Sequence, residues 1–208
     1  MSEAVILKLI WNGHSCFTLE AAGSTLVLDP YQDGAVPGYA PLKLTADAVF
    51  CSHEHKDHGA REAVALSGKA SHIQVEEIPT FHDPERGALR GTNLIRVFSA
   101  EGLRAAHLGD LGCELEPEQK ERLKGLDALM IPVGGYYTID AKQAKALVDE
   151  LKPRVVIPMH YRSDHFGYDV IAPLEDFLTL CGDVVKYPGN TLELTAATPA
   201  QTAVLSYA

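Results

Sequence analysis

Cysteine is scarce in this chain, and its few copies are widely spaced. Only four occur among 208 residues, at positions 16, 51, 113 and 181, and no CxxC pair is present. Small disulfide-stapled domains and thiolate zinc sites both depend on closely spaced cysteines. The sequence therefore predicts neither, and we expect Cys16 and Cys51 to be small apolar residues on strands.

Basic clusters and long apolar runs are missing as well. Lys and Arg total 18 against 28 Asp and Glu, which gives a net charge of −10, and no run of basic residues occurs. Proteins that grip nucleic acid through its phosphates need clustered Lys and Arg, so a nucleic-acid partner is not expected. The apolar run near the start is too short for a signal peptide or a membrane span. We therefore expect a cytoplasmic protein with no membrane partner.

The chain does contain enough apolar residues for a full core. The composition is 46% hydrophobic and 22% charged, which is ordinary for a globular protein of this length. No linker, internal repeat or low-complexity tract divides it. We predict a single α/β domain over residues 1–208.

Alternating apolar residues indicate where the strands lie. Runs at residues 5–11, 15–20 and 24–28, broken by Asn12-Gly13 and Ala22-Gly23, predict an antiparallel meander. Further strands are expected at residues 47–51, 71–78 (ended by Pro79), 92–98, 103–108, 128–133 and 155–159, with weak ones near 184 and at 192–194. Helices are expected at 61–67, 117–124, 141–151 (with Asp140 as N-cap) and 173–181.

One hexapeptide, HEHKDH at residues 53–58, is dense in metal ligands and directly follows an apolar strand. Residues two apart project to the same side, so His53 and His55 can bind one divalent cation. Asp57 and His58 would then turn toward a second position. A solvated turn rich in histidine is the alternative, but such a turn has no need of a buried strand before it. The hexapeptide predicts one loop that supplies two metal sites.

Two metal sites need more ligands than one loop supplies. Three candidates stand at later strand ends: His82, Asp110 and His160. Each one alone has an ordinary structural explanation, but together with the hexapeptide they support one another. His72 competes with His82, and its place at the start of an alternating strand makes it the weaker candidate. His107 is out of phase with Asp110 on its strand, so we expect it to be structural.

These ligands, in this order, resemble the metallo-β-lactamase superfamily of metal-dependent hydrolases. Within it, the chain resembles the branch that contains L-ascorbate-6-phosphate lactonase, in the motifs WNGHSCF at 11–17, LDP at 28–30, PVGGYYT at 132–138 and VIPMHY at 156–161. The resemblance implies an αββα sandwich of two mixed β-sheets flanked by helices. It also implies that one ion is held by His53, His55 and His82, that a second is held by Asp57, His58 and His160, and that Asp110 bridges them.

The expected chemistry is hydrolysis. A water shared by two cations has a pKa of about 7, so a metal-bound hydroxide is available near neutral pH. We predict a binuclear hydrolase for a small-molecule ester, lactone or phosphoester, with Asp57 and Asp110 as catalytic carboxylates. The two divalent ions would be Zn or Mn, with Fe, Ni or Co as alternatives.

Several points stay open at this stage. A phosphodiesterase or nuclease of the same superfamily and a metal-binding protein without turnover are the alternative functions. A homo-oligomer is compatible with the sequence. Five further side chains lie in or beside the resembling motifs and are candidates for substrate contact or for purely structural roles: His14, Tyr136, Tyr137, Arg162 and His165.

Overall fold

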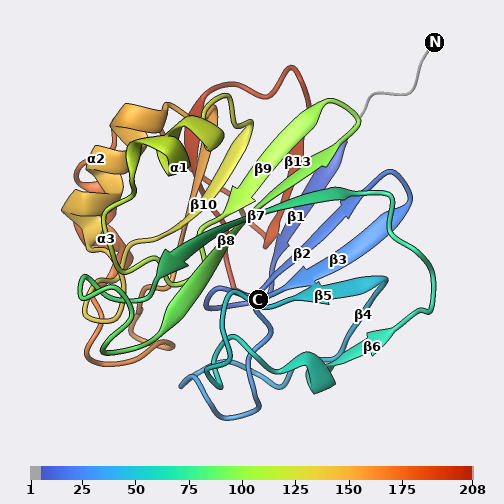
Figure 1. Cartoon of the computed structure of the whole chain (residues 1–208), viewed down its shortest axis with the longest axis horizontal. Helices are drawn as coiled ribbons and strands as arrows, with labels where there is room; N and C mark the ends of the chain where they lie inside the picture. Colours follow the sequence, from blue (N-terminus) through green and yellow to red (C-terminus); the bar gives the residue numbers. More distant parts are fainter. Residues whose placement is uncertain (1–5, 208) are drawn as a thin grey trace.

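The computed structural model describes residues 6–207, which form two facing β-sheets and three α-helices (Figure 1). The smaller sheet has five strands in the order β13-β1-β2-β3-β5. Strands β1 (Leu7–Trp11), β2 (Phe17–Ala21) and β3 (Ser24–Leu28) are the predicted antiparallel meander, which is thereby confirmed from residue 7 onward. Val5 lies outside the described residues. Strand β5 (Ala48–Phe50) runs parallel to β3, and β13 (Thr191–Leu194) pairs with β1.

The larger sheet has seven strands in the order β12-β14-β11-β10-β9-β8-β7. Its strands are β7 (Gln74–Phe81), β8 (Thr92–Ala100), β9 (Leu103–His107), β10 (Ala128–Pro132), β11 (Val155–Met159), β12 (Val184–Lys186) and β14 (Gln201–Val204). The sheet is parallel from β9 to β12 and antiparallel at β7, β8 and β9. Every residue of β10 and β11 is buried, as expected for central parallel strands covered on both faces.

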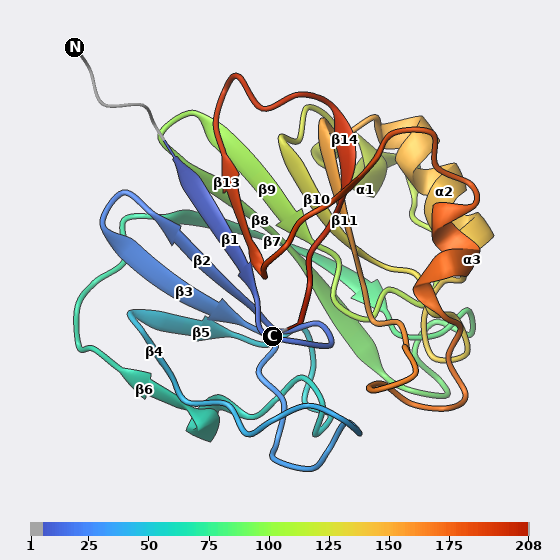
Figure 2. The same ribbon diagram turned by 180° about the vertical axis from the view of Figure 1, so that it is seen from behind.

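A single apolar core joins the facing sheets. Leu9 and Leu19 contribute from the smaller sheet, and Ile95 and Ala106 contribute from the larger one. Helices α1 (Pro117–Arg122), α2 (Ala141–Leu151) and α3 (Leu174–Leu178) gather beside the larger sheet (Figure 2). Asp140 caps α2 as predicted, because its carboxylate accepts the Gln143 N–H at 2.8 Å. The α/β fold class is confirmed. No α-helix among residues 6–207 is long and apolar enough to cross a bilayer.

The outer face of the smaller sheet is covered differently. A second apolar cluster packs Val27 of β3 against Tyr31, Val36 and Tyr39 of the following loop. The short parallel pair β4 (Leu44–Ala46) and β6 (Val64–Leu66) completes this cover. Among the described residues, a loop and a two-stranded ribbon therefore cover the outer face of the smaller sheet, whereas helices cover the larger sheet.

Two predicted elements were wrong. The helix expected at 61–67 is a single 3-10 turn at Arg61–Ala63 followed by β6, because pairing with β4 outweighs a weak local helix pattern. The strand expected to end before Pro79 continues through it to Phe81. Proline is tolerated there because β7 is an edge strand, where a missing N–H costs no ladder bond. Strand β14 was not predicted.

Candidate metal centre

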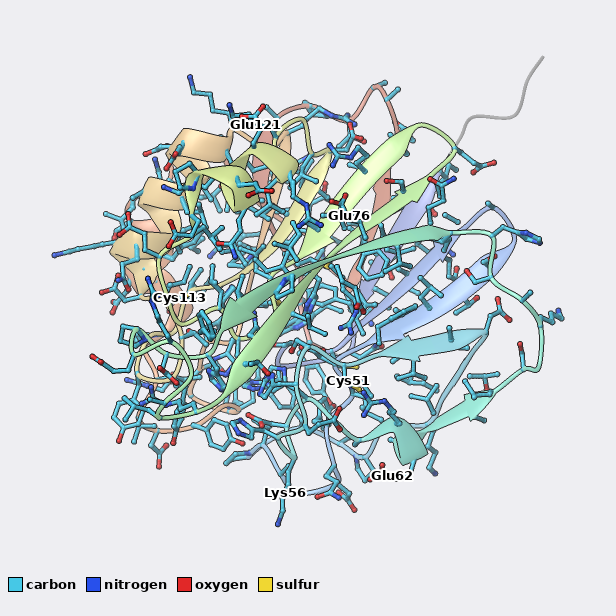
Figure 3. All side chains as sticks on the ribbon, viewed as in Figure 1. Cys51, Lys56, Glu62, Glu76, Cys113 and Glu121 are labelled. Carbon is cyan, nitrogen blue, oxygen red and sulfur yellow. The ribbon has the colours of Figure 1, made fainter. Side chains whose placement is uncertain are left out.

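The loop after β5 brings the hexapeptide side chains to one end of the two sheets. A turn in which the His58 and Gly59 N–H groups donate to the His55 carbonyl, at 3.0 and 2.8 Å, reverses the chain. The turn buries His58 and leaves Lys56 exposed, pointing away from the molecule in Figure 3. The rings of His53 and His55 lie with centroids 4.5 Å apart. The loop therefore gathers its histidines, with His55 exposed at the rim and His58 buried, and directs its lysine outward (Figure 3).

The three later candidates reach the same place from other strand ends. His82 follows β7, Asp110 follows β9 and His160 follows β11. The Nε2 atoms of His82 and His160 both lie 3.3 Å from Asp110 Oδ2. His58 Nε2 lies 3.1 Å from Asp110 Oδ1. All seven predicted ligand side chains are thus brought together, whereas His72 is exposed and lies outside the cluster.

Gly109 allows Asp110 to enter the site. Its φ is +55°, and a Cβ at this position would lie 2.3 Å from Asn93 Oδ1 and 2.4 Å from Ser52 Cβ. Only glycine meets both demands without strain. Asn93 in turn accepts the Asp110 N–H at 2.9 Å through the same oxygen, which holds the carboxylate in place.

The ligand atoms form two separate sets. His53, His55 and His82 make one set, and His14, Asp57, His58 and His160 make the other; within each set the ligand atoms all lie within 4.8 Å of one another. A third group of the same kind, His53, His58 and Asp110, connects them. Asp110 therefore stands between two candidate cation positions.

The buried polar atoms of the site fit divalent cations. Two ligands of a tetrahedral zinc ion bound at about 2.0–2.1 Å stand about 3.3 Å apart, which is close to the distances from Asp110 to its histidines. Several of these atoms are buried and have no hydrogen-bond partner among the described residues: His14 Nε2, His53 Nε2, His58 Nε2, His160 Nε2 and Asp110 Oδ1. Leaving one such group unpaired costs about 1–3 kcal/mol, so a cluster of them calls for a ligand.

A second layer of hydrogen bonds orients the ligands. Asp29, at the end of β3, lies 2.7 Å from His58 Nδ1 through Oδ2. Ser52 donates to the same carboxylate through its backbone N–H and its hydroxyl, each at 2.6 Å. Because Asp29 accepts a hydrogen bond from Nδ1–H of His58, Nε2 of the same ring is directed toward the cluster as the metal-binding atom.

The charges of the site attract a cation. Although burial alone would raise the pKa of Asp110, neighbouring histidines hold it well below its usual range, and the same is true of Asp57. Burial would lower the pKa of His58, but Asp110 and Asp57 raise it well above its usual value. Burial lowers the pKa of His53 to about 3, so that its ring is the neutral form that binds metals. The carboxylates therefore provide an excess of negative charge that a proton or a metal ion must balance.

His14 lies closer to the centre than the sequence indicated. Its Nε2 is 3.4 Å from Asp57 Oδ2, and its ring centroid is 4.2 Å from that of His160. Burial lowers its pKa to about 4. The residue has a φ of +52°, and Asp29 and His160 share this left-handed conformation. Such conformations cost energy and concentrate at functional sites. The GHS motif that follows Asn12 was the available signal.

The other side chains whose roles the sequence left undecided differ in whether they line the cavity. Tyr137 lines a cavity beside the ligands. Tyr136, in contrast, is 64% exposed and does not line this cavity. Arg162 is structural, because its Nε donates to the Ile171 carbonyl at 2.8 Å, and His165 is exposed. His107 is buried with Nε2 2.8 Å from the Ser15 carbonyl, which fits its expected structural role.

A family profile described as the Beta-lactamase superfamily domain matches residues 8–160, and the chain belongs to this superfamily. The protein is a metal-dependent hydrolase of the metallo-β-lactamase superfamily. Among curated relatives, it is similar to UPF0173 metal-dependent hydrolases. One from Thermococcus onnurineus is 28% identical over 230 residues, covering 91% of this chain and 100% of the relative. One from Thermoplasma acidophilum is 29% identical over 215 residues, covering 87% and 93%.

Solved structures agree with this assignment. A candidate Zn-dependent hydrolase of the superfamily from Thermotoga maritima is 35% identical, with a TM-score of 0.76, covering 96% of this chain and 98% of its own. The isothiocyanate hydrolase from Delia radicum gut bacteria has a TM-score of 0.70 at 14% identity, covering 91% of this chain and 100% of its own. At 14% identity, the similarity to the isothiocyanate hydrolase shows a shared fold and nothing more.

Proposed function

We propose that the protein is a binuclear hydrolase of a small-molecule ester, lactone or phosphoester. The position of Asp110 carries the proposal. One of its oxygens lies 3.3 Å from His82, a member of one ligand set, and 3.3 Å from His160, a member of the other. A carboxylate between two sets of imidazoles is suited to bridge two neighbouring cations.

In this proposal the ligands divide as the family resemblance implies. His53, His55 and His82 hold the first ion; Asp57, His58 and His160 hold the second; Asp110 bridges the two. Nitrogen and carboxylate ligands suit zinc and manganese, and iron, nickel or cobalt would also be accepted. Zinc has added support from the name of the Thermotoga maritima relative.

Divalent cations at these positions would supply a water of lowered pKa and would polarise the oxygen of the bond under attack. Residues of the chain orient the ligands and face the substrate. Asp29 keeps His58 in the tautomer that presents Nε2 to the centre. Asp57 and Asp110 both line the cavity, but Asp110 is almost fully buried, whereas Asp57 has 15% of its side chain exposed. Asp57 is therefore the more accessible of the two carboxylates on the substrate side, and it is ionised near neutral pH because, against the effect of burial, His58 and His14 hold its pKa well below its usual range.

The cavity and the charge support a small substrate. The cavity beside the ligands has a volume of about 280 Å³, near the lower end of the 300–1,000 Å³ usual for small-molecule sites. A net charge of −10 opposes the approach of a polyanion such as RNA. These observations favour a small metabolite of the cytoplasm over nucleic acid.

Elemental analysis of protein purified without chelator, paired with ester, lactone and phosphoester panels, tests the proposal. We expect two equivalents of metal and turnover of at least one panel member. Hydrolysis of bis-p-nitrophenyl phosphate far above that of every lactone and ester would point to the phosphodiesterase alternative. Bound metal without turnover on any panel would support a binding protein instead.

Asp110→Ala is the matching variant. It should lose metal and lower turnover about a thousandfold or more, since cation stabilisation of a transition state is worth several kcal/mol. Asp33→Ala, at an exposed loop carboxylate outside the ligand sets, is the control. Unchanged activity in Asp110→Ala would contradict the bridging role.

A further inference from the structure

Arg90 lies at the cavity beside the metal centre but belongs to neither ligand set. This cavity is lined by four proposed ligands and three other side chains: His55, Asp57, His82, Asp110, Arg90, Tyr137 and Tyr168. The guanidinium carbon of Arg90 stands 5.6 Å from the centroid of the Tyr137 ring, within cation–π range. A fixed positive charge is therefore placed where a substrate would enter.

Four of the eight arginines of this acidic chain make ion pairs with carboxylates, and Arg90 is not one of them. Arg61, Arg96, Arg122 and Arg154 each make an ion pair with Glu or Asp at 2.6–2.9 Å. Among residues 6–207, no carboxylate lies within ion-pair distance of the Arg90 guanidinium, and the Tyr137 hydroxyl makes no hydrogen bond. The Tyr168 hydroxyl, in contrast, already donates to the Ala35 carbonyl at 3.0 Å. Arg90 and Tyr137 thus keep free donors at the cavity.

The backbone holds Arg90 at a set position relative to the metal ligands. Asp83, which directly follows His82, accepts four backbone N–H groups of the next loop at 2.7–3.1 Å. The shortest of these bonds comes from Arg90 itself. The loop closes where the His82 N–H donates to the Gly91 carbonyl at 3.1 Å. One buried carboxylate therefore connects a proposed ligand to the free arginine.

We propose that Arg90 and Tyr137 form an anion-binding subsite, so that the substrate carries a carboxylate or a phosphate at a distance from the bond that is cleaved. Guanidinium groups bind both anions through paired N–H donors, and stacking on an aromatic ring orders the group without using those donors. The effect on substrate choice rests on the proposed hydrolase function. The anion site itself is tested by binding alone.

Calorimetric titration of the metal-loaded protein is the first test. The probes are glutarate and glycerol 3-phosphate, with glutaramide and glycerol as neutral counterparts. Arg90→Gln should weaken the binding of at least one anion about tenfold. Comparing the two anions shows whether carboxylate or phosphate is preferred. Arg90→Lys, which keeps the charge but loses the planar fork, should restore part of the affinity.

Arg86→Gln is the matched control. It makes the same charge change in the same loop, but Arg86 is exposed and lines a different cavity. Its Kd for each anion should stay within about twofold of the wild-type value. Equal affinities of wild type and Arg90→Gln for both anions would overturn the proposal. So would equal losses in Arg86→Gln and Arg90→Gln, since they would reflect net charge alone.

A pair of esters links the subsite to catalysis. The 4-nitrophenyl monoester of glutaric acid carries a free carboxylate, and its carboxamide counterpart is neutral. Arg90→Gln should lower kcat/KM about tenfold for the first and leave the second within about twofold. If the wild type hydrolyses neither ester, that result counts against the hydrolase function. The subsite would still be supported if calorimetry shows that Arg90→Gln has lost anion binding. If the wild type hydrolyses both esters and Arg90→Gln leaves the ratio of their kcat/KM values unchanged, the subsite is overturned while the hydrolase function stands.

Discussion

His58, in the loop after β5, and Asp29, at the end of the neighbouring parallel strand β3, form a 2.7 Å hydrogen bond. This bond decides which nitrogen of His58 faces the metal centre. The Asp29 carboxylate accepts from Nδ1, so Nε2 points toward Asp110. Burial alone would raise the pKa of Asp29, but His107 and His58 lower it to about 2. Asp29 is therefore ionised under ordinary conditions.

Asp29→Asn should weaken metal binding by about 10- to 100-fold, as loss of a carboxylate behind a histidine ligand generally does. The fold should persist, since the amide keeps an acceptor for Ser52. Competition with a chelator of known affinity measures the change, and Asp33→Asn serves as control. An unchanged metal affinity would show that Asp29 acts only in packing.

His14→Asn tests whether His14 belongs to the second ligand set. We expect weaker binding of one of two Co²⁺ equivalents, because His14 Nε2 lies beside Asp57 and has no other partner among the described residues. Asparagine is chosen because it tolerates positive φ. The visible absorption of Co²⁺ during titration resolves the two equivalents. His165→Asn, at an exposed histidine, should leave both unchanged, and two intact equivalents in His14→Asn would assign His14 to packing.

Gly109→Ala should destabilise the metal-free protein by about 2–4 kcal/mol, through both backbone strain and a clash with Asn93 and Ser52. Gly102→Ala separates the two effects. Gly102 also has a positive φ, but a Cβ there meets nothing within 4 Å, so only the strain of about 1–2 kcal/mol applies. Urea unfolding measures both variants. An equal decrease in the free energy of unfolding in Gly109→Ala and Gly102→Ala would mean that the close approach at Gly109 costs nothing.

Metal uptake should depend on pH through His58. Its pKa is raised in the metal-free protein by Asp110 and Asp57, so the stability that the charged ring contributes is present at low pH. This contribution is lost as pH rises through the raised pKa. A cation must displace the same proton, so metal affinity should increase with pH and uptake at pH 7 should release protons. Calorimetry in buffers of different ionisation enthalpy counts them, and zero protons released would contradict the assignment.

The sequence was most informative where ligand type and strand position coincide. HEHKDH after an apolar run, and His82, Asp110 and His160 after others, predicted a cluster that the fold does bring together. It was least informative for short elements. Residues 61–67 carry a weak helix pattern, but β6 is decided by its partner β4, which lies some 20 positions earlier.

The sequence by itself determined the superfamily, the kinds of ligand and the strand ends that carry them, because these depend on local order and residue type. Only the tertiary structure decided that His14 lies beside Asp57 and His160 and that Arg90 lies unpaired at the cavity. Those two facts depend on contacts between segments far apart in the chain, which no local pattern records. The left-handed backbone at His14, Asp29 and His160 has the same origin, since surrounding contacts must hold a conformation that local preference disfavours.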